Sequence, residues 1–182
     1  MVARWGFFKN QHNTTMELFA RADEAKAGSC DIHTKIGAIV VDAEGRELVR
    51  ACNTMPEGLD VTPECLERPA KYQWIAHAEV NAICHAARRG IKLEGAIMVM
   101  SCNPVPCTEC ARAIIQSGIR MVVGRDMDQV ASSRWDSSCE FALSMLTKAG
   151  VAVVYVSATP RVVMGNGTLS DESKAFLKLF EA

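Results

Sequence analysis

Two short stretches constrain this chain more than any other feature of its sequence. The first is His77-Ala78-Glu79 and the second is Pro106-Cys107-Thr108-Glu109-Cys110. One imidazole and two thiolates are ligand types that Zn²⁺ prefers, and a catalytic zinc site keeps three protein ligands and an open fourth position. We therefore expect His77, Cys107 and Cys110 to bind one catalytic zinc ion per chain.

The spacing within each stretch supports this interpretation. Cys107 and Cys110 are three residues apart, which puts both sulfurs on one side of a helix. Pro106 suits a helix entrance because it has no N–H to donate, and the electropositive start of a helix favours thiolates. Glu79 lies two residues from His77, and such residues do not face the same way. We expect Glu79 to point at the fourth position and to carry protons there.

Other metal sites are open on the sequence alone. A structural zinc would need a fourth protein ligand, and four side chains could supply it: Cys102, Cys84, Cys65 and His85. A second structural zinc could also form from His85 with Cys65 or Cys84. Glu79, close to His77, argues against a purely structural site, because a zinc with four protein ligands has no open position at which this carboxylate could act.

Length and composition narrow the remaining classes of protein. The 182 residues fit one domain, which we place at 1–182. A net charge of -1 gives no reason to expect nucleic acid as a partner. We expect no signal peptide, because the apolar run at Trp5 is short and ends at Lys9, and no apolar run is long enough for a membrane helix. The eight cysteines are then expected to be reduced, in the cytoplasm.

Periodicity predicts an α/β chain with one mixed sheet and helices on both faces. The first helix should be capped by Thr14, end near Gly28 and bury Met16, Phe19 and Ala20. The expected strands are 36–42, 47–52, 96–101, 121–123 and 151–156. The other expected helices are 77–88, 107–117, 137–148 and one in the C-terminal segment 165–182. Residues 53–75 have no clear period and are interpreted as a flap over the site or a surface insertion.

The pattern H-x-E…P-C-x-x-C is the signature of zinc-dependent nucleobase deaminases. With it, the stretches from His77 to Ile83 and from Pro106 to Cys110 resemble the cytidine and deoxycytidylate deaminase superfamily. The runs from Ser29 to Val41 and from Cys52 to Gly58 resemble the deoxycytidylate branch. This resemblance implies a cytidine-deaminase-like three-layer sandwich with a five-stranded mixed sheet.

The resemblance also implies an activity and its residues. It implies hydrolytic deamination of dCMP to dUMP, with Glu79 as the proton shuttle. Asn53, Ala78 and Asn103 would contact the substrate, although Asn103 stands where the family usually has Thr. Relatives form homo-oligomers, and many are regulated by deoxynucleoside triphosphates such as dCTP and dTTP. Candidates for a substrate phosphate are Lys35, Arg112 and Arg161.

Three alternatives to dCMP deamination stay open. The substrate could be another small nucleobase compound, such as a nucleoside, a modified dCMP or a purine. It could be a base within tRNA or single-stranded DNA, which must be unstacked before reaction. The chain could also be a zinc-stabilised module without turnover, which the presence of Glu79 disfavours.

Overall fold

The structure is a computed structural model that describes residues 11–125, 136–156, 161–163 and 174; for 11–14, 136 and 161–163 only the backbone is described. It contains a six-stranded sheet with the order β2-β1-β3-β4-β5-β6. β3, β4 and β5 run parallel, and β1, β2 and β6 pair antiparallel with their neighbours. The strands are β1 Gly37–Val41, β2 Glu47–Cys52, β3 Ile97–Met100, β4 Met121–Arg125, β5 Ala152–Val156 and β6 Arg161–Val163.

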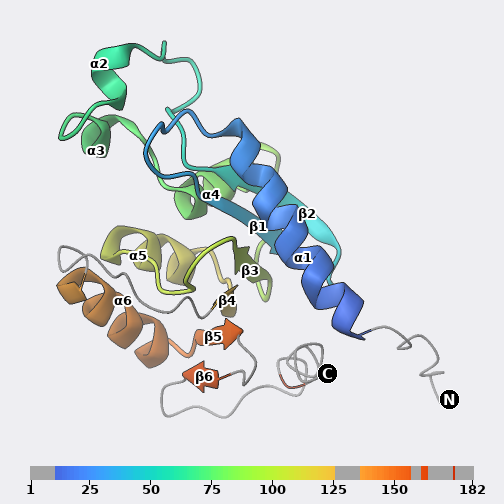
Figure 1. The fold of residues 1–182 in the computed structure, drawn as a ribbon. Helices are drawn as coiled ribbons and strands as arrows, with labels where there is room; N and C mark the ends of the chain where they lie inside the picture. Colours follow the sequence, from blue (N-terminus) through green and yellow to red (C-terminus); the bar gives the residue numbers. More distant parts are fainter. Residues whose placement is uncertain (1–10, 126–135, 157–160, 164–173, 175–182) are drawn as a thin grey trace, which may run out of the picture.

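Helices cover both faces of this sheet (Figure 1). On one face α1 packs on β1 and β3, and on the other α4 lies over β1 and β2 while α6 contacts both α5 and β5. The helices are α1 Gln11–Ala25, the 3₁₀ turn η1 Lys26–Gly28, α2 Pro63–Leu66, α3 Lys71–Trp74, α4 Ala78–Arg88, α5 Thr108–Gln116 and α6 Asp136–Lys148.

Alternation along the strands supplies a separate core to each face. Ile39 and Val41 of β1 point into the core under α1, and Ala38 and Val40 point into the core under α4, α5 and α6. Every residue of β1 is buried, so β1 is an inner strand enclosed on both faces. The predicted three-layer α/β arrangement is therefore confirmed.

The mixed sheet and its five predicted strands are confirmed, and β6 adds a short sixth strand at the edge beyond β5. Three residues gave too weak a pattern for this strand to be recognised. The C-terminal helix expected in 165–182 lies outside the described residues, apart from Lys174.

Two details predicted for the first helix are wrong. α1 begins at Gln11, so Thr14 lies inside the helix and does not cap it. Met16 is 58% exposed, and Ala20 is also exposed. The buried positions are those in the i, i+3, i+4, i+7 stripe that starts one residue earlier: Thr15, Leu18, Phe19 and Ala22.

The sequence of segment 53–75 has no clear period and suggested a segment without secondary structure. The structure differs, because the segment contains α2 and α3. Figure 1 shows these two short helices standing away from the sheet. The segment is tied at its two ends, since Thr54 and Ala76 form a β-bridge in which each N–H donates to the other's carbonyl. Its role as a flap stays a prediction. No helix in the described ranges is long and apolar enough to cross a bilayer.

The stretches that carry the family resemblance meet at one end of the sheet, where β2 and β3 end and β1 begins. Antiparallel pairing puts the start of β1 beside the end of β3, and Ser101 Oγ accepts a hydrogen bond from the Gly37 N–H at 2.9 Å. The end of β2 lies there too, because the Asn53 N–H donates to the Ile36 carbonyl. The carboxyl ends of parallel strands are where α/β sheets place their sites.

Candidate metal centre and active site

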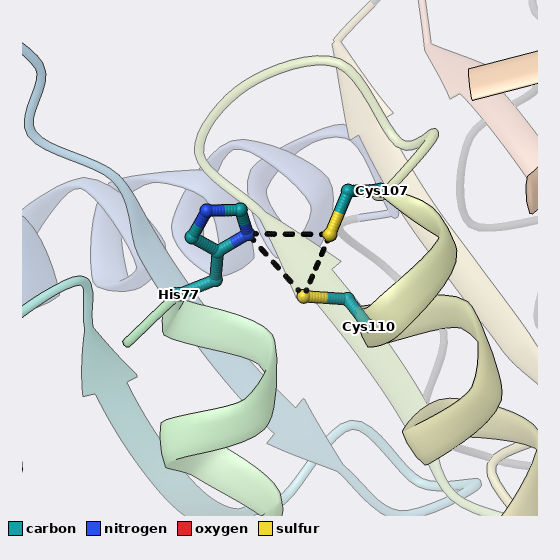
Figure 2. A group of neighbouring side chains, drawn as sticks. All are labelled: His77, Cys107 and Cys110. Atoms are coloured by element: carbon teal, nitrogen blue, oxygen red, sulfur yellow. Dashed lines mark hydrogen bonds between the residues drawn. The ribbon is translucent and has the colours of Figure 1, made fainter. Parts of the chain in front are cut away.

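The side chains of His77, Cys107 and Cys110 lie close together at this end of the sheet (Figure 2). His77 Nδ1 lies 3.4 Å from the Sγ atoms of both Cys107 and Cys110, and the two sulfurs are 3.5 Å apart. These three residues are the only group of at least three His, Cys, Asp or Glu side chains with metal-binding geometry in the described part of the chain. The predicted convergence is confirmed.

The spacing of the three donor atoms fits tetrahedral zinc. With Zn–S of about 2.3 Å and Zn–N of about 2.0 Å, tetrahedral angles require about 3.8 Å between sulfurs and about 3.5 Å between sulfur and nitrogen. The observed separations are within a few tenths of an ångström of these values. One nitrogen and two sulfurs are also a donor set that zinc accepts. The residues present therefore fit the ion.

The start of α4 fixes His77. His77 is the N-cap residue, with extended backbone angles, and its carbonyl accepts the Asn81 N–H at 3.0 Å. The Asn81 side chain reaches back and donates to the Cys52 carbonyl at 2.9 Å, which ties the first turn of α4 to the end of β2. The His77 side chain makes no capping hydrogen bond, and its ring faces the two cysteines (Figure 2).

The start of α5 fixes the two cysteines in a similar way. Cys107 is the N-cap residue of α5, and its thiol makes no capping hydrogen bond. Ser138 of α6 supplies the cap instead, because its Oγ accepts the Thr108 N–H at 3.1 Å. A side chain from a different helix thereby leaves the Cys107 sulfur available to a metal.

The three donor groups are electrostatically coupled. Hydrogen bonds from Cys110 and His77 lower the pKa of Cys107 to about 4, in spite of burial. The hydrogen bond to Cys107, and then burial, raise the pKa of Cys110. The hydrogen bond to Cys107 raises the pKa of His77. The mutual hydrogen bond favours one thiolate in the pair, so metal binding, which needs both thiolates, must release a proton.

Glu79 lies beside this group without belonging to it. Its side chain is buried and interacts with the Cys110 thiol, and the metal-binding group consists of the other three residues. Burial raises the pKa of Glu79, and the charge of His77 opposes that rise. A carboxyl group whose pKa is raised is better suited to accept and return protons than an ordinary surface carboxylate.

The residues predicted to contact a substrate occupy three different settings. Ala78 is the first residue of α4, where the helix itself does not use the backbone N–H. Asn103 lies in the loop after β3, where its Oδ1 accepts the Val105 N–H at 2.9 Å. Asn53 is buried and hydrogen-bonds to several groups of the chain, so a sugar would have to compete with these bonds. All three contacts stay predictions.

The other candidate ligands do not join a metal site. Among the side chains that the structure describes, none of Cys102, Cys84, Cys65 and His85 belongs to a cluster of three or more metal-ligand residues. Neither a fourth protein ligand nor the second structural zinc is therefore supported. Of the phosphate candidates, Lys35 is exposed, Arg112 pairs with Glu109, and the Arg161 side chain lies outside the described part.

A glycine in β4 sets the position of the loop that leads to Cys107. A Cβ atom on Gly124 would lie 2.4 Å from the Cys102 carbonyl oxygen and 2.6 Å from the Pro104 nitrogen. The loop is held there by a 2.9 Å hydrogen bond from the Arg125 N–H to the Cys102 carbonyl. Any larger residue at this position must push the loop off the strand.

Gly124→Ala should therefore disturb the metal site from a distance. We expect a loss of about 2 kcal/mol in the free energy of unfolding and about tenfold weaker zinc binding. Denaturant titration and competition with a zinc chelator measure the two effects. Gly150→Ala is the control, because a Cβ there meets nothing within 4 Å, although its φ of 80° is strained. It should lose stability alone, and equal zinc affinity in both variants would contradict the role of Gly124.

Sequence reasoning missed several residues that build this site. Ser138 caps α5 from thirty residues away, and no local pattern indicates such a contact. Asn81 had a weak local signal, since it stands four residues after His77, where one helical turn brings it close. Ser101 is a buried polar residue directly after β3, a position at which functional residues of parallel strands often lie.

The sequence matches the cytidine and deoxycytidylate deaminase zinc-binding region over residues 9–125. The chain belongs to this family. It is 30% identical over 156 residues to an uncharacterized deaminase from the luxG 3′ region of Aliivibrio fischeri, which covers 86% of this chain and 96% of that protein.

Relatives with an assigned substrate match over a shorter span. Human deoxycytidylate deaminase is 34% identical over 119 residues, 58% of this chain and 64% of the human one. The enzyme of Enterobacteria phage T2 is 38% identical over 93 residues, 45% of its length. The fold is that of the cyanophage S-TIM5 dCMP deaminase solved with dCMP and dUMP (TM-score 0.60, 23% identity, 78% of this chain and 95% of that one). The chain is therefore a member of a zinc-binding deaminase family and is related to the dCMP deaminases.

Proposed function

We propose that this protein hydrolyses dCMP to dUMP and ammonia with one zinc ion per chain. The observation that carries the proposal is the combination of three zinc-type donors and one buried carboxyl that is not among them. Three protein donors leave a tetrahedral ion one position for water or substrate. A binding module stabilised by zinc would need a fourth donor, and the described residues offer none.

His77, Cys107 and Cys110 would hold the ion, and a zinc ion there would lower the pKa of a water molecule from 15.7 to about 7. Glu79 would take a proton from the attacking water and deliver it to N3 of the cytosine ring as the oxygen adds to C4. It would then move the remaining proton from the new C4 hydroxyl to the amino group, so that the C4–N bond to that group breaks, C4=O forms, and ammonia leaves. Burial of Glu79 supports this role, because it keeps bulk water from competing for the protons.

The choice of dCMP rests on the sequence relatives that have an assigned substrate, which are deoxycytidylate deaminases from human and from phage. The exposed Lys35 offers a cation to the substrate phosphate, and Asn53, Ala78 and Asn103 are proposed contacts to the sugar and base. Asn103 in place of the usual Thr changes one wall of the pocket. It is the residue most suited to alter the choice of base.

A substrate screen tests the proposal directly. Purified zinc-loaded protein is incubated with dCMP, dCTP, cytidine, deoxycytidine, adenosine, guanine and short oligonucleotides, and released ammonia is measured. We expect kcat/KM for dCMP to exceed that for deoxycytidine by at least about tenfold, the effect of one charge-assisted contact to the phosphate. A preference for a nucleoside, a purine or an oligonucleotide would show that dCMP is the wrong substrate but that the protein is still a deaminase. If none of the compounds released ammonia, the proposed deaminase activity would be wrong.

We also propose that residues 1–182 form one domain and that copies of it associate as a homo-oligomer in the cytoplasm. Leu59, Val61, Tyr72 and Trp74 of the 53–75 segment are large, apolar and exposed in the single chain. Exposed apolar groups of this kind commonly mark contact surfaces. Analytical ultracentrifugation, with and without dCTP and dTTP, would show both the oligomer and any effect of these nucleotides.

A further inference from the structure

A buried ion pair joins two segments beside the active site. Lys71 Nζ of α3 lies 2.6 Å from Asp31 Oδ2 in the loop before β1, and each side chain is only 5% exposed. By comparison, the side chains of the Arg21–Glu47 pair between α1 and β2 are 23% and 18% exposed. The Asp31–Lys71 pair is thus much more deeply buried than that pair.

Asp31 organises the loop around it. Its Oδ1 accepts the backbone N–H groups of His33 at 2.8 Å and Thr34 at 3.1 Å. Its Oδ2, besides accepting from Lys71, lies 3.3 Å from the Asn53 amide nitrogen. Although burial raises the pKa of Asp31, the bonds from Lys71, His33 and Thr34 hold it below its usual value. The carboxylate form is thus fully used by groups of the chain.

Asn53 extends the same network to the end of β2. Its amide nitrogen also donates to the Thr34 carbonyl at 2.8 Å, and its Oδ1 accepts the Ile36 N–H at 2.7 Å and the Ser29 hydroxyl at 2.9 Å. All the hydrogen-bonding capacity of this amide is therefore used within the protein. The loop 29–36, the end of β2 and α3 are held together by one set of buried polar contacts.

These contacts are connected to the metal centre through short stretches of backbone, and none of them is made by His77, Cys107 or Cys110. From Lys71 the chain runs through Ile75, whose N–H donates to the Lys71 carbonyl, to Ala76, which bridges to Thr54, and then to His77. On the other side, the loop held by Asp31 leads to Gly37, which is bonded to Ser101 at the end of β3. His77 itself has an independent anchor in Asn81.

A buried ion pair is a weak source of stability, because removal of two charges from water cancels most of their attraction. A pair of apolar side chains would pack these segments as well. The ion pair instead fixes one relative position of the loop before β1 and α3, because the Asp31 carboxylate can bind its four donors in only one geometry.

We propose that the Asp31–Lys71 pair is a positioning element that fixes the two walls of the substrate pocket, the loop 31–36 and the chain from Lys71 to Ala76. This inference rests on the proposed function, since it concerns substrate binding at the same site. Neither residue is assigned to the metal or to the proton transfer. Loss of the pair should therefore raise KM, leave zinc in place and change kcat little.

The first test is Lys71→Met, which keeps most of the side chain's volume and removes its charge. We expect KM for the best substrate of the screen to rise about tenfold or more, kcat to change less than threefold and zinc to stay at one per chain. Hydrogen exchange should become faster in the peptides covering 29–36 and 71–76, because Lys71 no longer holds the Asp31 carboxylate that accepts the His33 and Thr34 amides.

A second variant guards against simple misfolding, because Lys71→Met leaves a buried carboxylate unpaired. The double variant Asp31→Asn/Lys71→Gln restores a neutral hydrogen-bonded pair, and we expect it to recover at least half of the loss in log KM. Arg21→Met is the matched control, since it breaks a partly buried ion pair away from the site and should leave KM unchanged. All variants are compared below the onset of their thermal unfolding.

The outcomes separate this inference from the proposed function. If no compound in the screen is deaminated, the exchange experiment still decides, and unchanged exchange in 29–36 and 71–76 of Lys71→Met would overturn the positioning role. With an active enzyme, a KM within twofold of the wild type would overturn it too. Loss of zinc in Lys71→Met would likewise do so, because the pair would then support the metal ligand.

Discussion

Replacing Glu79 with glutamine should lower kcat by about 10⁴-fold, the upper end of what one general acid–base group contributes. Glutamine has nearly the same shape and can still hydrogen-bond, but it cannot accept a proton from water and return it to the ring. Because Glu79 is not one of the three grouped donors, zinc should stay bound at about one ion per chain. Activity and metal content should therefore separate in this variant.

The measurement is ammonia release at saturating substrate, with zinc determined on the same protein sample. Glu109→Gln is the matched control, since Glu109 lies in the first turn of α5 next to Cys110 but is exposed and paired with Arg112. It should keep kcat within about twofold, as expected for an exposed surface pair. A Glu79→Gln variant that retained more than about a tenth of the wild-type kcat would falsify the proton-shuttle role.

The metal centre could be predicted from the sequence because its requirements are local. Two cysteines three residues apart at a helix start have fixed relative positions, whatever the rest of the fold does. His77 comes from a second helix, and its arrival beside the cysteines depends on how α4 and α5 pack. That His77 lies beside the two cysteines could be predicted only from the resemblance to a family in which the two motifs together form one zinc site.

The contacts that hold the site in place could not be predicted for the opposite reason. Ser138 and Thr108 meet across α5 and α6, and Asp31 and Lys71 meet across forty residues. Such partners depend on tertiary geometry, and Ser, Asp and Lys are by default expected at the surface. Asn53 shows the same limit, because its motif gives no sign of the buried hydrogen bonds that its amide makes to Ile36 and Thr34. A substrate would have to compete with these bonds, and the contact stays a prediction.

Helix α1 shows how small an error the amphipathic pattern leaves. The pattern predicts burial of the apolar Met16, yet the polar Thr15 is buried and Met16 is 58% exposed. A stripe on a helix is about 100° wide, so a shift of one residue moves a side chain from its centre to its edge or beyond. Hydrophobicity alone does not choose between adjacent registers when both contain Phe19.

The second large effect should appear when Cys110 is replaced by alanine. Cys110 is buried, and its sulfur is one of the three donors, so two protein ligands would remain. We expect zinc to be lost on dialysis and turnover to fall below detection. Stability should fall as well, because a ligand that binds only the folded state stabilises it by mass action, about 4 kcal/mol at a thousand times its Kd.

A chelator distinguishes loss of the metal from loss of packing at Cys110. Wild-type protein should lose about 10 °C in Tm on chelation, from about 4 kcal/mol at 2–4 °C per kcal/mol for a chain of this size. Cys110→Ala should start from a lower Tm and show no further shift, since it has no zinc to lose.

Cys102→Ala decides between the catalytic and the structural kinds of zinc site. Cys102 is another thiol near the site, and burial raises its pKa to about 12, which disfavours the thiolate that a metal needs. If the site has three protein ligands, this variant keeps its zinc and the full chelator-induced shift in Tm. If Cys102→Ala lost zinc as Cys110→Ala does, the ion would have four protein ligands. No position would then be left for water, and the deaminase mechanism could not operate.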